Sequence, residues 1–169
     1  MKRTTIVSVI VLLTLTLTEA FAQKSIYTPK DLRQMNLLAD TSMWSYTRME
    51  CTENFAIMWQ KGFGYDLSCP PKLEGQPMRV DLDNLKEKLE SYYAFFRDSL
   101  QFVRPGSKTE RLRMMVMLNY SLEGTAYGGD YDGEIGALWL APNRVQDKKL
   151  NCIAHELGHS FQSQITCDG

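Results

Sequence analysis

The sequence has no excess of charge of either sign: 19 lysines and arginines face 20 aspartates and glutamates, which gives a formal net charge of −1. Without a basic excess there is no electrostatic reason to expect a nucleic acid as a partner. Glycine (11) and proline (6) are too scarce for a fibrous or low-complexity chain. The hydrophobic content of 44% is too high for a disordered one. A length of 169 residues then leaves room for one folded domain.

The sequence also has no apolar run long enough to span a bilayer, which takes about 20 residues. The longest run, Ile6–Leu17, follows the positive pair Lys2–Arg3 and precedes Ala20–Ala22, a small-x-small cleavage site. This pattern predicts a signal peptide over residues 1–22 and a mature domain over 23–169. We therefore expect a secreted or periplasmic protein with no stable membrane anchor; the alternative is an uncleaved anchor.

Cysteine is scarce, and in an exported chain its pairing matters. Cys51, Cys69, Cys152 and Cys167 allow three complete pairings. If the stretch from Cys152 onward is helical, the Cα atoms of Cys152 and Cys167 are about 20 Å apart. A disulfide needs Cα atoms within roughly 7 Å, so this pair is not expected. Cys51 with Cys69 is the easiest local pair. Reduced, buried thiols are the alternative.

Apolar periodicity indicates both helices and strands, and we expect an α+β fold. Two stretches of the chain, 62–79 and 121–133, are rich in glycine, proline or aspartate and are expected to be loops. The second of these is acidic, so a calcium loop is an alternative, although the EF-hand spacing is absent. The helices are predicted over 28–40, 81–102 and 147–165, the strands over 54–59, 111–120 and 135–140, and an extended segment over 44–50.

The two histidines of the chain lie four residues apart, as His155 and His159, with Glu156 next to the first. In a helix, residues i and i+4 lie on one face, so two imidazoles can converge on one ion. This H-E-x-x-H pattern predicts zinc on His155 and His159, and Glu156 as the general base for a zinc-bound water that attacks a carbonyl. Gly158 lies inside the predicted helix, where glycine is less stabilising than alanine. This predicts that another part of the chain packs closely there, or that the absence of a side chain serves the site. The alternative is two ordinary helix histidines.

A zinc hydrolase needs a third protein ligand. The metzincin pattern is excluded because Gln162 and Ile165 stand where its glycine and third histidine would be. Asp168 could serve only if the chain turns back at once. As written, the site is expected to be incomplete.

Three stretches of the chain resemble a family of secreted bacterial proteins that carry a domain of unassigned function and are regarded as zinc metallopeptidases of the gluzincin type. The stretches are Glu53–Gly64, Ile135–Pro142 and Ala154–Gln162, and the likeness runs from about residue 44 to residue 168. The resemblance implies zinc on the two histidines and Glu156 as the base. It also implies further sequence after Gly169, with a helix that bears an acidic ligand.

We therefore expect a zincin-like N-terminal subdomain in which a small twisted sheet packs on the 81–102 helix and the H-E-x-x-H helix. The expected function is exported, zinc-dependent hydrolysis of a peptide or protein substrate. The strand Ile135–Leu140 would pair with the substrate along its edge, through Gly136, Ala137, Leu138 and Trp139. Two alternatives stay open: a non-catalytic remnant or binding protein on the same scaffold, and a zinc amidase that acts on cell-wall material.

Overall fold

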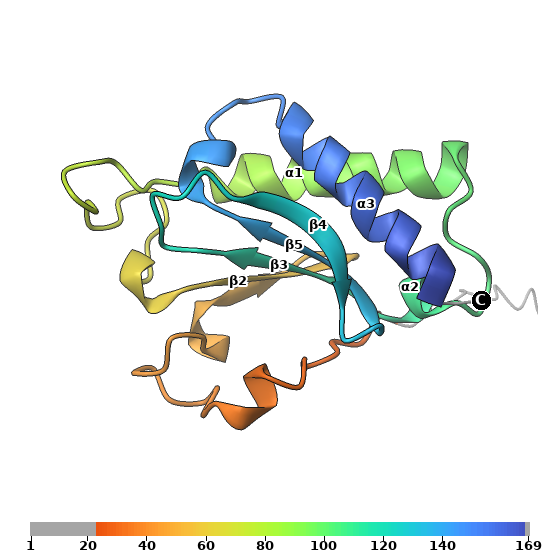
Figure 1. Ribbon diagram of the computed structural model, residues 1–169, viewed down its shortest axis with the longest axis horizontal. Coiled ribbons are helices and arrows are strands. Elements are labelled where there is room, and N and C mark those ends of the chain that lie inside the picture. Colours follow the sequence, from red (N-terminus) through yellow and green to blue (C-terminus); the bar gives the residue numbers. More distant parts are fainter. Residues whose placement is uncertain (1–22, 168–169) are drawn as a thin grey trace, which may run out of the picture.

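A computed structural model describes residues 23–167, which form an α+β fold around one five-stranded sheet (Figure 1). The expected α+β class is thus confirmed. The predicted signal peptide lies outside the described residues. Within them, no helix is long and apolar enough to cross a membrane. The strands are β1 (Met49–Cys51), β2 (Phe55–Trp59), β3 (Met114–Leu118), β4 (Ala126–Tyr131) and β5 (Ile135–Leu140), and the α-helices are α1 (Leu82–Ala94), α2 (Lys108–Arg111) and α3 (Asn151–Cys167).

The strands lie in the order β1-β2-β3-β5-β4. The inner three, β2, β3 and β5, are parallel, and each outer strand is antiparallel to its neighbour. Every residue of β2 and β3 is buried, as expected for parallel strands that are covered on both faces. The strands predicted over 54–59 and 135–140 are confirmed as β2 and β5. The strand predicted over 111–120 is present as the shorter β3, because Arg111 ends the helix α2.

The helices α1 and α3 cover the same face of the sheet (Figure 1). Leu85 and Leu89 of α1 and Leu157 and Phe161 of α3 are buried in one core with the strands. The predicted 81–102 helix is present as α1, which continues into a π-helical turn, η4 (Phe95–Ser99). Packing of both predicted helices on the sheet is thus confirmed.

The opposite face is covered by the segment that precedes β1, which forms a second core. A helix was expected there over 28–40, and that prediction is wrong. Only a three-residue 3₁₀ turn forms, η1 (Leu32–Gln34), and the chain turns extended at Met35 (φ −97°, ψ 153°). Leu32 and Leu37 reach the core while Leu38 is 82% exposed, so tertiary contacts override the helical spacing. The extended 44–50 segment is in part a second 3₁₀ turn, η2 (Tyr46–Arg48), before β1.

The loop expected over 121–133 contains the edge strand β4, so that prediction is also wrong. A turn then joins β4 to β5, and its acidic side chains are engaged in hydrogen bonds. Asp130 accepts from the backbone N–H of Gly133, and Asp132 accepts from Lys30 N and from the Tyr27 hydroxyl. The bond from Lys30 N holds the pKa of Asp132 below its usual range. These carboxylates fasten a hairpin and brace the N-terminal segment.

The last helix begins later than predicted, at Asn151 rather than near residue 147. Leu150 adopts a left-handed conformation (φ 51°), which a helix interior does not accommodate. The thiols of Cys51, Cys69 and Cys152 are free, so the local pair of Cys51 with Cys69 is not formed.

Candidate metal centre

The helix α3 brings the two histidines together on its exposed side. His155 Nε2 and His159 Nε2 are 3.1 Å apart. The ring centroids are 4.7 Å apart and the rings are nearly perpendicular, at 89°. Both residues are exposed. Their spacing on successive turns is the geometric reason why the two rings meet.

A separation of this size suits two ligands of one ion. Two nitrogens each 2.0–2.1 Å from a tetrahedral zinc lie about 3.3 Å apart. In the absence of an ion, the same two nitrogens fit an N–H···N hydrogen bond, in which one ring donates to the other. The donor set is thus suited to zinc, and it is also compatible with a simple pair of hydrogen-bonded rings.

The next turn of α3 supplies a partner for the other nitrogen of His159. His159 Nδ1 and Gln162 Oε1 are 3.3 Å apart. When Nδ1 carries the proton and donates to this amide oxygen, Nε2 is left with a lone pair. Metal-binding histidines are generally oriented by such a bond from their second nitrogen.

Glu156 lies beside the histidines but faces the sheet. Its side chain is half-buried, and Oε2 accepts a hydrogen bond of 2.9 Å from the backbone N–H of Gly128 in β4. The general base predicted from the sequence is therefore held against the edge strand. Sequence reasoning missed Gly128 because the two residues are 28 positions apart.

Gly128 allows α3 to lie directly on β4. A Cβ at this position would be 1.7 Å from the backbone oxygen of Glu156, which no side chain can occupy. At Gly158, where a close approach was one expectation, the nearest neighbour of a Cβ would be Phe96 Cζ at 3.4 Å, an ordinary contact. The close approach between helix and sheet is thus made by Gly128.

The predicted substrate strand is not at an edge. β5 is hydrogen-bonded to β3 on one side and to β4 on the other, so Gly136, Ala137, Leu138 and Trp139 cannot pair with a further chain. The prediction of substrate pairing along β5 is therefore wrong, because a six-residue strand that was read as a loop covers that edge. Among residues 23–167, the sheet edge beside α3 that has no neighbouring strand is that of β4, and we call it the open edge.

The pairing pattern shows which groups β4 presents at its open edge. In an antiparallel pair, residues alternate between those that bond to the partner and those that point away. Thr125 accepts from Ala141 N, while the N–H of Gly128 turns to Glu156. By this alternation Ala126, Gly128 and Asp130 direct their backbone groups to the open edge.

No group of three or more His, Cys, Asp or Glu side chains within residues 23–167 could hold a metal ion together. The histidine pair is thus without a third protein ligand in this part of the chain. Asp168, named from the sequence as a candidate, lies outside the described residues.

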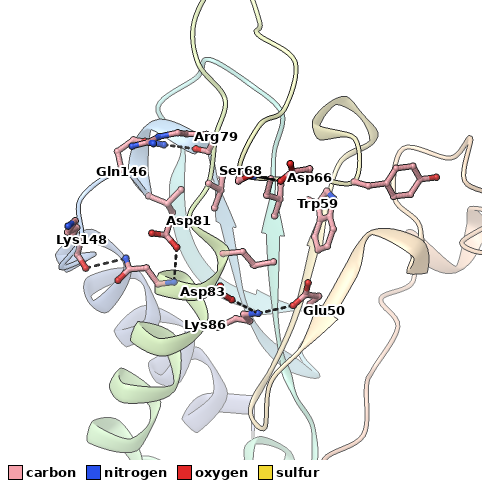
Figure 2. Close-up of a pocket in the computed structure, with 16 residues that line it drawn as sticks. Glu50, Trp59, Asp66, Ser68, Arg79, Asp81, Asp83, Lys86, Gln146 and Lys148 are labelled. Carbon is pink, nitrogen blue, oxygen red and sulfur yellow. Dashed lines mark hydrogen bonds and ion pairs between the residues drawn. The ribbon is translucent and has the colours of Figure 1, made fainter.

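A separate cavity of about 460 Å³ lies at the start of α1, and none of His155, Glu156 and His159 lines it (Figure 2). Three of its charged side chains form ion pairs: Lys86 Nζ is 2.9 Å from both Glu50 and Asp83. Asp66 accepts from the backbone and hydroxyl of Ser68, which lowers its pKa. The two histidines are exposed and are therefore not part of this cavity.

The sequence matches the Family of unknown function (DUF6055) over residues 18–169. No curated protein and no solved structure matches it. The family description assigns no activity, so any function has to be argued from the residues of the chain itself.

Proposed function

The chain belongs to the DUF6055 family, and from the geometry of its own residues we propose that it is an exported, zinc-dependent peptidase. The observation that carries the proposal is the convergence of His155 Nε2 and His159 Nε2 to 3.1 Å on an exposed helix face. The signal-peptide pattern supports export, and the resemblance to gluzincin-type proteins supports the choice of a peptide substrate.

In this proposal His155 and His159 hold the zinc ion through Nε2, and Gln162 fixes the ring of His159. Zinc, when bound, would activate a water molecule and polarise the carbonyl of the scissile bond. The third ligand has to come from outside residues 23–167, and Asp168 is the nearest carboxylate in sequence.

Glu156 acts as the general base. Its carboxylate takes a proton from the attacking water and delivers it to the leaving amine. The N–H of Gly128 holds one carboxylate oxygen and so orients the side chain between α3 and β4. A general base contributes about 10²–10⁴-fold to the rate of such a reaction.

The substrate strand in this proposal is β4, in place of the predicted β5. An extended peptide that adds to this edge would be hydrogen-bonded by the outward backbone groups of Ala126 and Asp130 and by the carbonyl of Gly128, whose N–H is already bonded to Glu156. Because Gly128 lies against Glu156, a peptide on this edge would be brought next to the general base. The parallel inner strands, the antiparallel edge strand and the H-E-x-x-H helix above it support a zincin-like architecture.

The proposal is tested by metal analysis and peptide hydrolysis on the purified protein. We expect one zinc ion per chain, lost on dialysis against a chelator, and cleavage of a fluorogenic peptide library. Glu156→Gln should keep the zinc and lose at least 100-fold in rate. Glu123→Gln, which alters an exposed carboxylate elsewhere, is the matched control and should cleave normally.

Other outcomes favour the two alternatives. Zinc that fails to bind at micromolar supply would favour a non-catalytic scaffold. Zinc binding with no peptide cleavage, but with release of amide-linked fragments from cell-wall material, would favour an amidase.

A further inference from the structure

An aromatic strip lies on the face of the sheet that is turned away from α3. It consists of Tyr127 and Tyr131 of β4 and Trp139 of β5. The ring centroids of Tyr127 and Trp139 are 5.6 Å apart, and those of Trp139 and Tyr131 are 5.1 Å apart. Since Gly128 contacts α3 and successive residues of a strand alternate between faces, Tyr127 and Tyr131 lie on the opposite face.

One end of the aromatic strip is fixed by the N-terminal segment. The Tyr131 hydroxyl donates a hydrogen bond of 2.8 Å to Asp31 Oδ2. Trp139 packs against the core on that face. Tyr131 and Trp139 are therefore held in place, and Trp139 contacts the third ring, that of Tyr127.

Tyr127 is at the other end of the strip and is 59% exposed. Its hydroxyl end leans over Gly129, where an added Cβ would be 3.0 Å from the Tyr127 hydroxyl oxygen. The missing side chain at Gly129 lets the ring lie along the edge strand. One side of the Tyr127 ring covers Gly129, as aromatic side chains often cover a glycine in an edge strand. The other side of the ring is exposed, beside the open edge of β4.

We propose that Tyr127 is a specificity-determining residue that selects aromatic or aliphatic side chains at alternate positions of an extended peptide paired with β4. The inference rests on the proposed function. A peptide added to the edge would direct every second side chain to the face of the aromatic strip. Side chains directly opposite in neighbouring strands lie about 4.5–5.5 Å apart at Cβ, and aromatic or β-branched pairs are favourable there.

The test uses two fluorogenic ten-residue peptides that are identical except that alternate positions hold Phe in one and Ser in the other. With zinc-loaded protein we expect kcat/KM to be about fivefold higher for the Phe peptide, the size of one good cross-strand pair. In Tyr127→Ala the preference should fall below about twofold, through a loss of kcat/KM for the Phe peptide. Tyr127→Phe should keep the preference, and Tyr65→Ala, at another exposed tyrosine, should not change it.

The outcomes separate this inference from the proposed function. Equal cleavage of the two peptides, or a preference that survives in Tyr127→Ala, overturns the role of Tyr127 and leaves the peptidase intact. If zinc-loaded protein cleaves neither peptide, the peptidase fails, and fluorescence anisotropy of the labelled peptides decides the inference. Tighter binding of the Phe peptide, lost in Tyr127→Ala, would support it, and equal binding would overturn it.

Discussion

Gly128 is the residue on which the closeness of α3 to the sheet depends. An added methyl group would occupy the space of the Glu156 backbone oxygen, 1.7 Å away. The clash is with a backbone atom, so α3 and β4 would have to move apart to relieve it. The same glycine donates its N–H to the Glu156 carboxylate, so helix position and general base are fixed together.

We therefore expect Gly128→Ala to lower the free energy of unfolding by about 1–3 kcal/mol or more, since the core would be overpacked. Gly158→Ala is the matched control. Its Cβ would meet only Phe96 at 3.4 Å, and alanine is favoured over glycine inside a helix by about 0.5–1 kcal/mol. Urea unfolding of both variants measures the difference. Similar losses in the two would contradict the close approach at Gly128.

The part of the candidate site that follows from local geometry could be predicted from the sequence. The meeting of His155 and His159 follows from i, i+4 spacing on a helix, and the structure places their nitrogens 3.1 Å apart. The bond between Gly128 and Glu156 could not be predicted, because it joins residues 28 positions apart through tertiary packing. Gly128 can be read in the sequence, but a glycine is equally expected in a surface loop, so its presence alone does not indicate a contact with a helix.

At the scale of elements, α1 begins where a capping side chain accepts a hydrogen bond from one of its free N–H groups. Asp81 accepts a hydrogen bond of 3.0 Å from Asn84 N. The carboxylate also lies at the positive end of the helix dipole. This helix contributes Leu85, Leu89 and Tyr93 to the main core, so its start affects the stability of the whole face.

We expect Asp81→Ala to lower the free energy of unfolding by about 1 kcal/mol, and Asp81→Asn, which keeps a capping oxygen, to stay within a few tenths of the wild-type value. Asp83→Ala is the control: this side chain is 93% exposed and its contact with Lys86 is a surface ion pair, which is worth little. Thermal or urea unfolding ranks the three. If Asp83→Ala costs as much as Asp81→Ala, capping is not the cause.

The elements that could be predicted are those in which local pattern and tertiary burial agree. β2 and β3 are continuous apolar runs, and both are buried throughout. β4 was missed because Gly128, Gly129 and Asp130 have low strand propensity. The glycines are there because α3 and the Tyr127 ring cover them. The helix expected over 28–40 failed for the opposite reason: its apolar spacing was helical, but only part of it is buried.

At the scale of the whole molecule, the beginning of the described chain is tied to three distant elements. Lys24 Nζ donates to the Tyr93 hydroxyl of α1 (2.5 Å) and to the Thr109 carbonyl of α2 (2.6 Å). Ser25 forms a parallel bridge with Leu112, just before β3. The first residues of the predicted mature domain thus connect α1 and α2 to the sheet beside β3.

Burial lowers the pKa of Lys24 from its ordinary value of 10.5 to about 8, although Glu90 and Glu53 lie near enough to oppose the shift. Between these two values the unfolded chain keeps a proton that the folded protein has released. The contribution of Lys24 to the free energy of unfolding therefore rises with pH from about 8. Tyr93 opposes this at higher pH: burial raises its pKa above the ordinary value of 10, so the folded protein keeps a proton there that the unfolded chain loses.

We therefore expect the free energy of unfolding of the wild type, minus that of Lys24→Met, to increase as the pH rises from about 8 to 10. The variant removes the titrating group and retains an unbranched apolar side chain in the same half-buried position. Urea unfolding of both proteins at pH 7.5, 8.5 and 9.5 gives the difference directly, and groups that titrate alike in the two proteins cancel. A difference that stays constant over this range would mean that Lys24 binds its proton equally well in the folded and unfolded states, and that its docking against Tyr93 and Thr109 does not desolvate the ammonium group.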